Sequence, residues 1–340
     1  MNWAYGIGIF IGLLFLALLI TLVFVFYFSY LFPRDENGKY SLKSRLEITW
    51  NMFRLMTGLL SPERARGFSG IHALYKTWDH HLVTERTLYI NFGYWEKARN
   101  LDDACEALAG LLADRADFGP RDTVLDVGFG FGDQDMYWAE NRRAKKITGL
   151  NVTPHQVETA RRRVAEKGLG KKIDLQEGSA TDIPFKDKTF TRVAALECAF
   201  HFRPREKFFQ EAHRVLKPGG RMVAADIIAP LRIGWKEKIL MRYGHSQWQI
   251  PMENFYNRHE YERRLLEAGF DRVEIFPIQE LVWPPLKKFM LEAMKSDRFR
   301  KKLHPLHRNP FSRFFYVTST CFLWPLLKLE YIVAVAYKGK

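Results

Sequence analysis

The chain has 340 residues, a net charge of +14 at pH 7 and three cysteines. This length is enough for one sizeable catalytic core. The cysteines are scattered without the spacing of a metal or redox site, which excludes a disulfide-stapled fold. A net positive charge favours binding to nucleic acid, to an anionic membrane surface or to an acidic substrate. No nucleic-acid recognition motif accompanies the charge, so we expect no nucleic-acid partner.

The first 33 residues contain no Asp, Glu, Lys or Arg. The apolar run from Trp3 to Phe32 exceeds the roughly 20 residues that cross a bilayer as a helix, and aromatic side chains lie near both of its ends. A cleavable signal peptide has a shorter apolar run between basic and small residues, and a buried core helix has a polar face; neither description applies. Basic residues follow the run and none precede it. We therefore predict a single-pass membrane anchor over 1–33, with the catalytic domain on the cytoplasmic side.

A basic helical connector is predicted over 34–90, and the catalytic domain over 91–340. Within that domain short apolar segments alternate with helical patterns. The expected strands are 123–127, 146–150, 173–176, 191–196 and 221–227, and the expected helices are 102–116, 133–140, 154–167, 206–216 and 258–268. This alternation predicts an α/β fold with a parallel sheet covered by helices on both faces. Residues 270–278 and 330–336 are expected to close the sheet.

Two insertions interrupt the predicted domain. Residues 229–257 follow the carboxyl end of a strand and carry several aromatic side chains, so we expect them to form a lid over the ligand-binding edge. Residues 279–328 include a basic-aromatic segment, 287–313, in which nine Lys and Arg face only two acidic residues. Such a mixture favours contact with lipid headgroups in a tethered protein. A helix with a solvated basic face, a substrate contact and a protein contact remain open for this segment.

A glycine-rich turn follows the first predicted strand, where Val124 to Gly132 reads Val-Leu-Asp-Val-Gly-Phe-Gly-Phe-Gly. Glycines between a strand and a helix let the backbone turn tightly and approach a ligand. The dinucleotide-binding pattern is G-x-G-x-x-G, but here the third glycine comes one position early. Asp133 then occupies the sixth position, where a carboxylate repels a pyrophosphate. This spacing disfavours a nicotinamide-dependent oxidoreductase.

From Asn91 to Ile228 the chain resembles the class I S-adenosylmethionine-dependent methyltransferases. The resemblance is greatest to a small-molecule branch, which includes sugar O-methyltransferases of natural-product pathways and tocopherol-type methyltransferases. It rests on motifs that occur in order: Asn91-Phe-Gly-Tyr-Trp95, the glycine loop, Gly149-Leu-Asn-Val-Thr-Pro154, Gly178-Ser-Ala-Thr-Asp-Ile-Pro-Phe185, Leu196-Glu-Cys-Ala-Phe-His-Phe202 and Arg214-Val-Leu-Lys-Pro-Gly-Gly220. It implies a Rossmann-like sheet and S-adenosylmethionine as the cofactor.

The resemblance also implies which residues contact the cofactor. They are Tyr94, Trp95, Asp126, Gly128, Gly130, Gly132, Asn151, Gln156, Ser179, Ala180 and Glu197. The loop residues cradle the methionine part, Asn151 meets the ribose hydroxyls where relatives have Asp or Glu, and Ser179 with Ala180 lies against the adenine. An amide offers both an acceptor and a donor, so ribose recognition survives the change. Tyr94 and Trp95 either close over the sulfonium or pack in the core, as aromatics usually do.

A candidate base for an acceptor hydroxyl is His201, which follows the fourth predicted strand, while Asp226 ends the fifth. The resemblance assigns deprotonation of the acceptor to these two positions, and an imidazole oriented by a carboxylate suits that task. Alternatively, His201 bonds within its loop and Asp226 caps the sheet edge. Glu197 is a weaker candidate base, with a substrate or structural contact as its other roles. Two histidine pairs, 80–81 and 304/307, have no third ligand of suitable spacing, so no metal is expected.

These features together predict a membrane-anchored methyltransferase that acts on a hydroxyl of a lipophilic small molecule. Lipids, quinones, polyketides and glycosylated natural products all fit this description. C-methylation of a prenylated or aromatic substrate is the nearest alternative, because it too needs proton removal. A tethered scaffold without turnover is an alternative of a different class. Neither the acceptor nor the oligomeric state follows from the sequence.

Overall fold

The structure is a computed structural model that describes residues 84–235, 238, 249–302 and 329–340. The predicted anchor and most of the predicted connector lie outside these ranges, as do parts of both predicted insertions. Within the described ranges no helix has the length and apolar character needed to span a membrane. The anchor therefore remains a prediction from the sequence.

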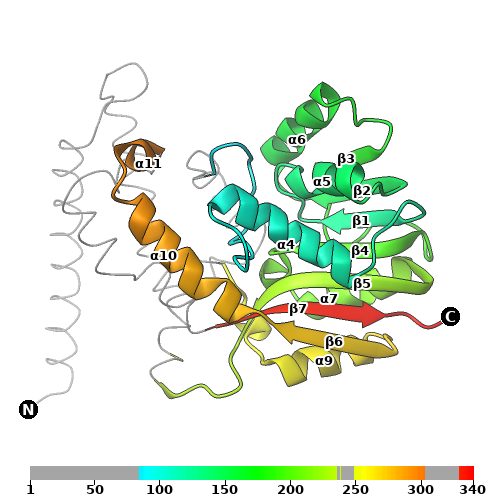
Figure 1. The fold of residues 1–340 in the computed structure, drawn as a ribbon. Helices are drawn as coiled ribbons and strands as arrows, with labels where there is room; N and C mark the ends of the chain where they lie inside the picture. The colour runs from blue at the N-terminus through cyan, green and yellow to red at the C-terminus, as the bar shows by residue number, and fades with distance from the viewer. Residues whose placement is uncertain (1–83, 236–237, 239–248, 303–328) are drawn as a thin grey trace, which may run out of the picture.

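A seven-stranded sheet in the order β3-β2-β1-β4-β5-β7-β6 forms the centre of the described fold (Figure 1). The strands are β1 (Thr123–Val127), β2 (Lys146–Asn151), β3 (Ile173–Glu177), β4 (Phe190–Leu196), β5 (Leu216–Ile228), β6 (Arg272–Pro277) and β7 (Glu330–Tyr337). The first five pair in parallel, as the alternation predicts. Each expected strand is present.

The sheet is nevertheless mixed, because β7 runs antiparallel to both of its neighbours, β5 and β6. The expectation of a parallel sheet is wrong for this part. A parallel partner for β6 needs a crossover that returns the chain to the opposite end of the sheet. Here β7 begins close to where β6 ends, since the amide of Ile278 donates to the carbonyl of Tyr331 at 2.8 Å.

The five predicted helices begin and end within about two residues of their expected bounds, and the described residues contain two more helices within 279–328. Together these helices are α4 (Leu101–Arg115), α5 (Asp133–Asn141), α6 (Pro154–Glu166), α7 (Arg205–Val215), α9 (Arg258–Glu267), α10 (Trp283–Ala293) and α11 (Asp297–Lys302), with short 3-10 turns η4 (Ala199–His201), η5 (Met252–Asn254) and η6 (Gln279–Leu281). Local chemistry explains several starts. Asn100 caps α4 by accepting the amide of Asp103 at 2.9 Å, and Pro154 opens α6.

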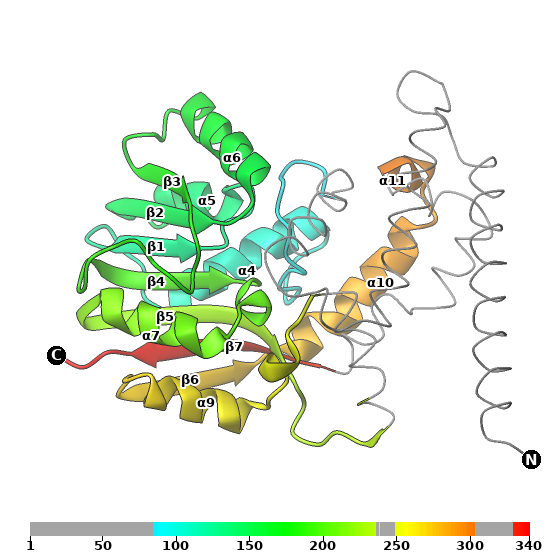
Figure 2. The same cartoon turned by 180° about the vertical axis from the view of Figure 1, so that it is seen from behind.

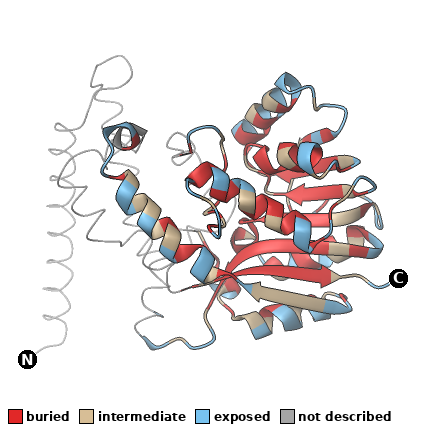
Figure 3. Ribbon diagram, in the orientation of Figure 1, coloured by how far each residue is buried: buried red, intermediate tan, exposed pale blue. Residues whose placement is uncertain are grey.

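Helices cover both faces of the sheet, as Figures 1 and 2 show from opposite sides. One apolar cluster joins α4, α5, α6 and α10 to one face and includes the fully buried Leu108 and Trp138. A second cluster joins α7 and α9 to the other face through Phe208, Phe209 and Tyr261. The central strands are buried and the edge strand β6 is only half-buried (Figure 3). This burial on both faces fits the near-continuous apolar sequence of the central strands.

The residues that end or follow the parallel strands lie together at one edge of the sheet, and several of them are polar. The glycine loop follows β1, Asn151 ends β2, the turn η4 follows β4, and Asp226 lies near the end of β5. The carboxyl edge of an open α/β sheet is where ligands bind.

Candidate active site

A cavity of about 380 Å³ lies at this carboxyl edge. Its volume is at the small end of the range for sites that hold small molecules. Of the residues predicted from the sequence, it is lined by Gly128, Gly130, Asn151, Gln156, Ser179, Ala180, Glu197 and His201. The remaining predicted residues, Tyr94, Trp95, Asp126, Gly132 and Asp226, lie off its wall.

Gly128 shows why the loop after β1 needs glycine. Its φ is +75°, and an added Cβ lies 2.6 Å from Cβ of Cys198. Its amide donates to the carbonyl of Leu150 at 2.7 Å, which holds the loop against the end of β2. A side chain at Gly128 is therefore excluded by both conformation and space. Gly132 starts α5, so its role is to turn the chain into that helix.

Two fully buried carboxyl groups lie behind the loop, on Asp126 of β1 and Asp135 of α5. No donor among the described residues makes a hydrogen bond of good geometry to their carboxylate oxygens, although Gln134 lies close enough to lower the pKa of Asp126. Burial raises the pKa of Asp126, and the neighbouring Asp135 raises it further. Burial also raises the pKa of Asp135, to about 7. The raised pKa values favour the neutral acids, as expected for buried carboxyl groups that lie behind the loop and not on the cavity wall.

Asn151 connects three parts of the site. Its Nδ2 donates to Oε1 of Gln156 at 2.8 Å and lies 3.4 Å from the carbonyl of Gly130. The end of β2 is thereby tied to α6 and to the glycine loop. In the turn after β3, Oγ of Ser179 is 2.9 Å from Oγ1 of Thr181. These positions suit the ribose and adenine contacts predicted for them, which remain predictions.

Trp95 packs in the core. Its Nε1 donates to the carbonyl of Phe92 at 2.8 Å, and its ring centroid is 5.1 Å from that of Phe289 in α10. Tyr94 is partly buried against the same core. The chain turns away from the cavity at Gly93, where φ is +78° and an added Cβ lies 2.6 Å from Cβ of Ala104. Of the two roles considered for these aromatics, core packing is the one that Trp95 adopts here.

Sequence reasoning missed several apolar residues of the cavity wall. They are Leu88, Tyr89, Ile90, Phe129 and Phe131. The first three precede the Asn91 motif as an apolar run, and the two phenylalanines alternate with the glycines of the loop. Both patterns were visible in the sequence. Apolar residues next to a motif usually belong to the core, so neither pattern by itself predicts a ligand contact.

Glu197 occupies a strained position on the cavity wall, with φ at +51°. Its Oε1 accepts the amide of Phe92 at 2.7 Å and also the hydroxyl of Tyr331 in β7. Burial raises the pKa of this carboxyl to about 8, although the bonds from Tyr331 and Phe92 lower it. Glu197 therefore carries a proton at neutral pH. This state fits a structural or substrate contact better than a base.

His201 ends the turn η4 and is 5% exposed. Its Nδ1 lies 3.4 Å from the backbone carbonyl of Gln249. Burial, with smaller contributions from Arg203 and Arg205, lowers the pKa of the imidazole to about 4, although the bond to Gln249 raises it. The ring is thus neutral near pH 7, which is the form that accepts a proton.

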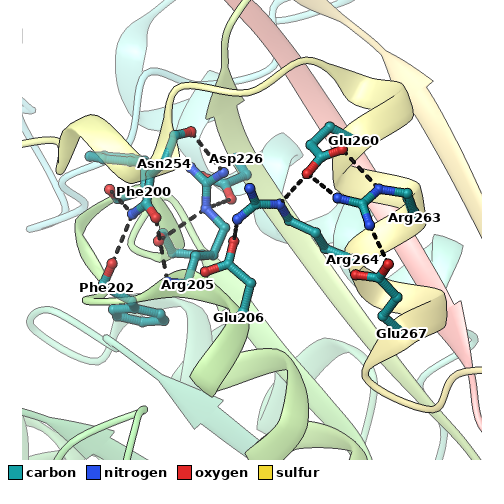
Figure 4. A network of polar contacts seen from close by, with 11 residues as sticks. Phe200, Phe202, Arg205, Glu206, Asp226, Asn254, Glu260, Arg263, Arg264 and Glu267 are labelled. Atoms are coloured by element: carbon teal, nitrogen blue, oxygen red, sulfur yellow. Dashed lines mark hydrogen bonds and ion pairs between the residues drawn. The ribbon is translucent and has the colours of Figure 1, made fainter.

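Asp226 does not have the surroundings expected from the sequence. Its Oδ2 forms an ion pair with Nε of Arg205 at 3.1 Å and accepts the hydroxyl of Tyr261 at 3.0 Å, while Oδ1 accepts the amide of Ile227 at 2.9 Å. Figure 4 shows the carboxylate within this buried network beside Arg205. These bonds give Asp226 the role of a sheet-edge anchor. Its role in orienting His201 stays a prediction that none of these bonds supports.

The fold and the cavity beside the glycine loop define a Rossmann-like α/β protein with a ligand site at the carboxyl edge of its sheet. A family model described as a methyltransferase domain matches residues 125–224. The chain is 36% identical over 283 residues to erythromycin 3''-O-methyltransferase of Saccharopolyspora erythraea, covering 81% of this chain and 92% of that protein. It is 28% identical over 230 residues to O-methyltransferase resE of Aspergillus sclerotiorum, covering 67% and 85%. Among solved structures, the cyclase SpnF matches with a TM-score of 0.61 at 20% identity, over 79% of this chain and 96% of that chain.

The chain belongs to the class I S-adenosylmethionine-dependent methyltransferases, and S-adenosylmethionine is its cofactor. The likeness to the cyclase shows the fold alone, because one fold hosts many reactions. Family membership overturns the alternatives of a tethered scaffold and of a nicotinamide-dependent oxidoreductase.

The residues present fit this cofactor. Gly128 lets the backbone of the loop approach a ligand in a place that a Cβ would fill, and Gly128 and Gly130 both line the cavity. Asn151 and Ser179 provide polar groups at the ends of β2 and β3. When bound, S-adenosylmethionine supplies an electrophilic methyl group. The protein binds, orients the acceptor, excludes water and handles the acceptor proton.

Proposed function

We propose that the enzyme methylates a hydroxyl on the sugar of a glycosylated, lipophilic natural product, with His201 accepting the hydroxyl proton. The observation that carries this proposal is the position of His201. It is a neutral imidazole on the wall of the cavity that also contains the glycine loop. A neutral imidazole accepts a proton without first losing one.

The similarity to erythromycin 3''-O-methyltransferase supports the substrate class, because it extends over 92% of that protein. The apolar wall built by Tyr89, Phe129 and Phe131 supports a largely apolar ligand next to the polar site. In the proposed reaction a bond forms between the acceptor oxygen and the methyl carbon. The sulfur–methyl bond breaks with its electron pair left on sulfur, and the hydroxyl proton moves to His201.

The test is incubation with S-adenosylmethionine carrying a ¹³C-labelled methyl group and a panel of acceptors. The panel contains erythromycin lacking its 3''-O-methyl group, other glycosylated macrolides, their sugar-free aglycones and a prenylated quinol. Nuclear magnetic resonance then identifies the labelled atom. Label in a sugar O-methyl group is the expected result. Label on a ring carbon of the quinol favours the C-methyltransferase alternative. Label on an aglycone oxygen shows that the methylated hydroxyl is not on the sugar and contradicts that part of the proposal.

We also propose that residues 1–33 anchor the enzyme in a membrane with the catalytic domain on the cytoplasmic side. The support is the uncharged run followed by basic residues. A tether keeps the enzyme where lipophilic acceptors dissolve. Expression of the full chain followed by membrane isolation and alkaline carbonate extraction is the test. Retention in the membrane pellet is expected, and release into the supernatant contradicts the anchor.

A further inference from the structure

The turn that carries His201 is held by residues from the far end of the insertion after β5. Asn254, in η5, is 1% exposed. Its Nδ2 donates to the carbonyl of Phe200 at 3.0 Å and to the carbonyl of Phe202 at 2.8 Å. These two carbonyls flank His201 in the chain. A single amide group therefore clamps the backbone on both sides of the proposed base (Figure 4).

Arg205 locks this clamp to the sheet. Its backbone amide lies 3.4 Å from Oδ1 of Asn254, and its guanidinium donates to the carbonyls of Asn254 at 3.3 Å, Ala199 at 3.3 Å and Ile227 at 3.2 Å. The guanidinium is fully buried and is compensated by Asp226. Thus the first residue of α7 joins the His201 turn, the end of β5 and η5. Buried polar groups satisfied in this way rigidify the backbone that carries them.

The same end of the insertion also contacts the imidazole itself. The carbonyl of Gln249 lies 3.4 Å from Nδ1 of His201. A carbonyl oxygen can only accept a hydrogen bond, so Nδ1 carries the ring proton and the lone pair is on Nε2. Gln249 holds this carbonyl in place with φ at +52°, a conformation that a residue other than glycine adopts at a cost. The bond to the second ring nitrogen fixes the tautomer of a functional histidine.

From these contacts we infer that Asn254 is a positioning residue, which together with the Gln249 carbonyl holds His201 in the Nδ1–H tautomer at the cavity wall. The insertion after β5 thereby supplies the orientation that the sequence assigned to Asp226. The catalytic consequence rests on the proposed role of His201 as the base. The assignment of the tautomer does not depend on that role. The inference and the proposed function can therefore be overturned separately.

The experiment is nuclear magnetic resonance of the full-length protein labelled with ¹⁵N-histidine, with the His201 signals assigned from the His201→Gln variant. Long-range couplings report which ring nitrogen carries the proton. The wild type is expected to show the Nδ1–H form of His201 at pH 7. An Nε2–H form in the wild type overturns the inference, whether or not any variant folds.

Two variants test the clamp. Asn254→Ala removes the two bonds from Nδ2 and the longer contact of Oδ1 with the Arg205 amide, and Asn254→Asp keeps the shape but replaces the donating amide with an acceptor. Each is expected to convert the single tautomer into a mixture. The matched control is Asn257→Ala, because Asn257 also bonds two backbone amides through its side chain, those of His259 and Glu260 at 3.1 Å, without contacting the His201 turn. Persistence of the wild-type tautomer in both Asn254 variants overturns the inference.

Kinetics separate this inference from the proposed function. The substrate for these assays is the compound that takes up the ¹³C label in the acceptor panel. With it, Asn254→Ala is expected to lower kcat roughly 10- to 100-fold, since small misplacements of a reacting group cost this much. The same change made in His201→Gln should have no further effect, because a positioning residue acts through its partner. Equal losses in both backgrounds overturn the inference. Full activity of His201→Gln alone contradicts the proposed function and leaves the tautomer result standing.

Discussion

Nε of Arg205 lies 3.1 Å from Oδ2 of Asp226, and both side chains are fully buried. Their ion pair joins the start of α7 to the end of β5, beneath the turn that carries His201. Burial raises the pKa of Asp226, while Arg205 lowers it. The pair is thus a structural joint next to the site, in which the Asp226 carboxylate neutralises the charge of the buried Arg205 guanidinium.

Breaking this joint should destabilise the protein strongly. Asp226→Asn leaves a buried guanidinium without a counter-charge, so the free energy of unfolding is expected to fall by about 3–5 kcal/mol. Denaturant unfolding measures this. Asp187→Asn is the control, because Asp187 pairs with Arg214 at 2.8 Å while its side chain is 68% exposed; such a pair contributes at most about 1 kcal/mol. Similar small losses in both variants argue against the buried joint.

The glycine loop should tolerate no side chain at Gly128. Gly128→Ala combines a left-handed φ with a Cβ only 2.6 Å from Cys198, so the dissociation constant for S-adenosylmethionine is expected to rise on the order of 100-fold. Gly168→Ala has a similar φ of +68° but no atom within 4 Å of the added Cβ, and it should leave cofactor affinity unchanged. Calorimetric titration compares the two. Equal affinity in both variants refutes the close packing of the loop.

Asn151 should contribute to cofactor affinity through its amide. Asn151→Leu removes the bond to Gln156 and any polar contact with the ribose, so the dissociation constant for S-adenosylmethionine is expected to rise about tenfold or more. Asn151→Asp restores the carboxylate of most relatives and is expected to bind at least as tightly as the wild type. If Asp weakens binding as much as Leu does, Asn151 does not meet the ribose.

The buried carboxyl of Glu197 should make stability depend on pH. Its pKa is about 8 in the folded protein, against an ordinary value of 4.5 for a solvated glutamate. The folded state therefore binds a proton that the unfolded state has lost, and the free energy of unfolding falls as pH rises through this window. The lowered pKa of His201 acts in the opposite sense, but only between about 4 and 6.5.

The comparison is therefore made above that range, at pH 6.5 and pH 8. Between these values Glu197→Gln is expected to lose about 2 kcal/mol less of its unfolding free energy than the wild type does. Asp135 titrates in both proteins, so its contribution cancels in the difference. Identical declines in the two proteins show that Glu197 is not the titrating group.

The order of most elements could be predicted from the sequence because strand and helix periodicities differ and several helices carry local start signals, such as Asn100 before α4 and Pro154 in α6. Gly128 and Asn151 lie on the cavity wall because the first directly follows β1 and the second ends β2, and parallel strands end at one edge of the sheet. His201 lies there because the turn η4 that it ends comes shortly after β4. A strand over 330–336 is expected from the sequence, but its antiparallel direction is not, because direction depends on the end of the sheet to which the preceding segment returns the chain.

The partners of the buried charges were equally inaccessible to sequence reasoning. Asp226 has the right position for a catalytic carboxylate, yet it binds Arg205, which lies 21 residues earlier in the chain. Asn254 reaches the His201 turn across about 50 residues, and its amide bonds have no periodic signature. Such contacts depend on tertiary packing, which local patterns do not encode.

The most direct test of His201 as the base is the single-turnover rate of methyl transfer in His201→Gln, measured with the acceptor labelled in the panel. Glutamine keeps a polar side chain of similar size but cannot accept the hydroxyl proton as a base. We expect a rate lower by about 10²- to 10⁴-fold, with the dissociation constant for S-adenosylmethionine within about threefold of the wild type. A rate within threefold of the wild type contradicts the assignment of His201 as the base.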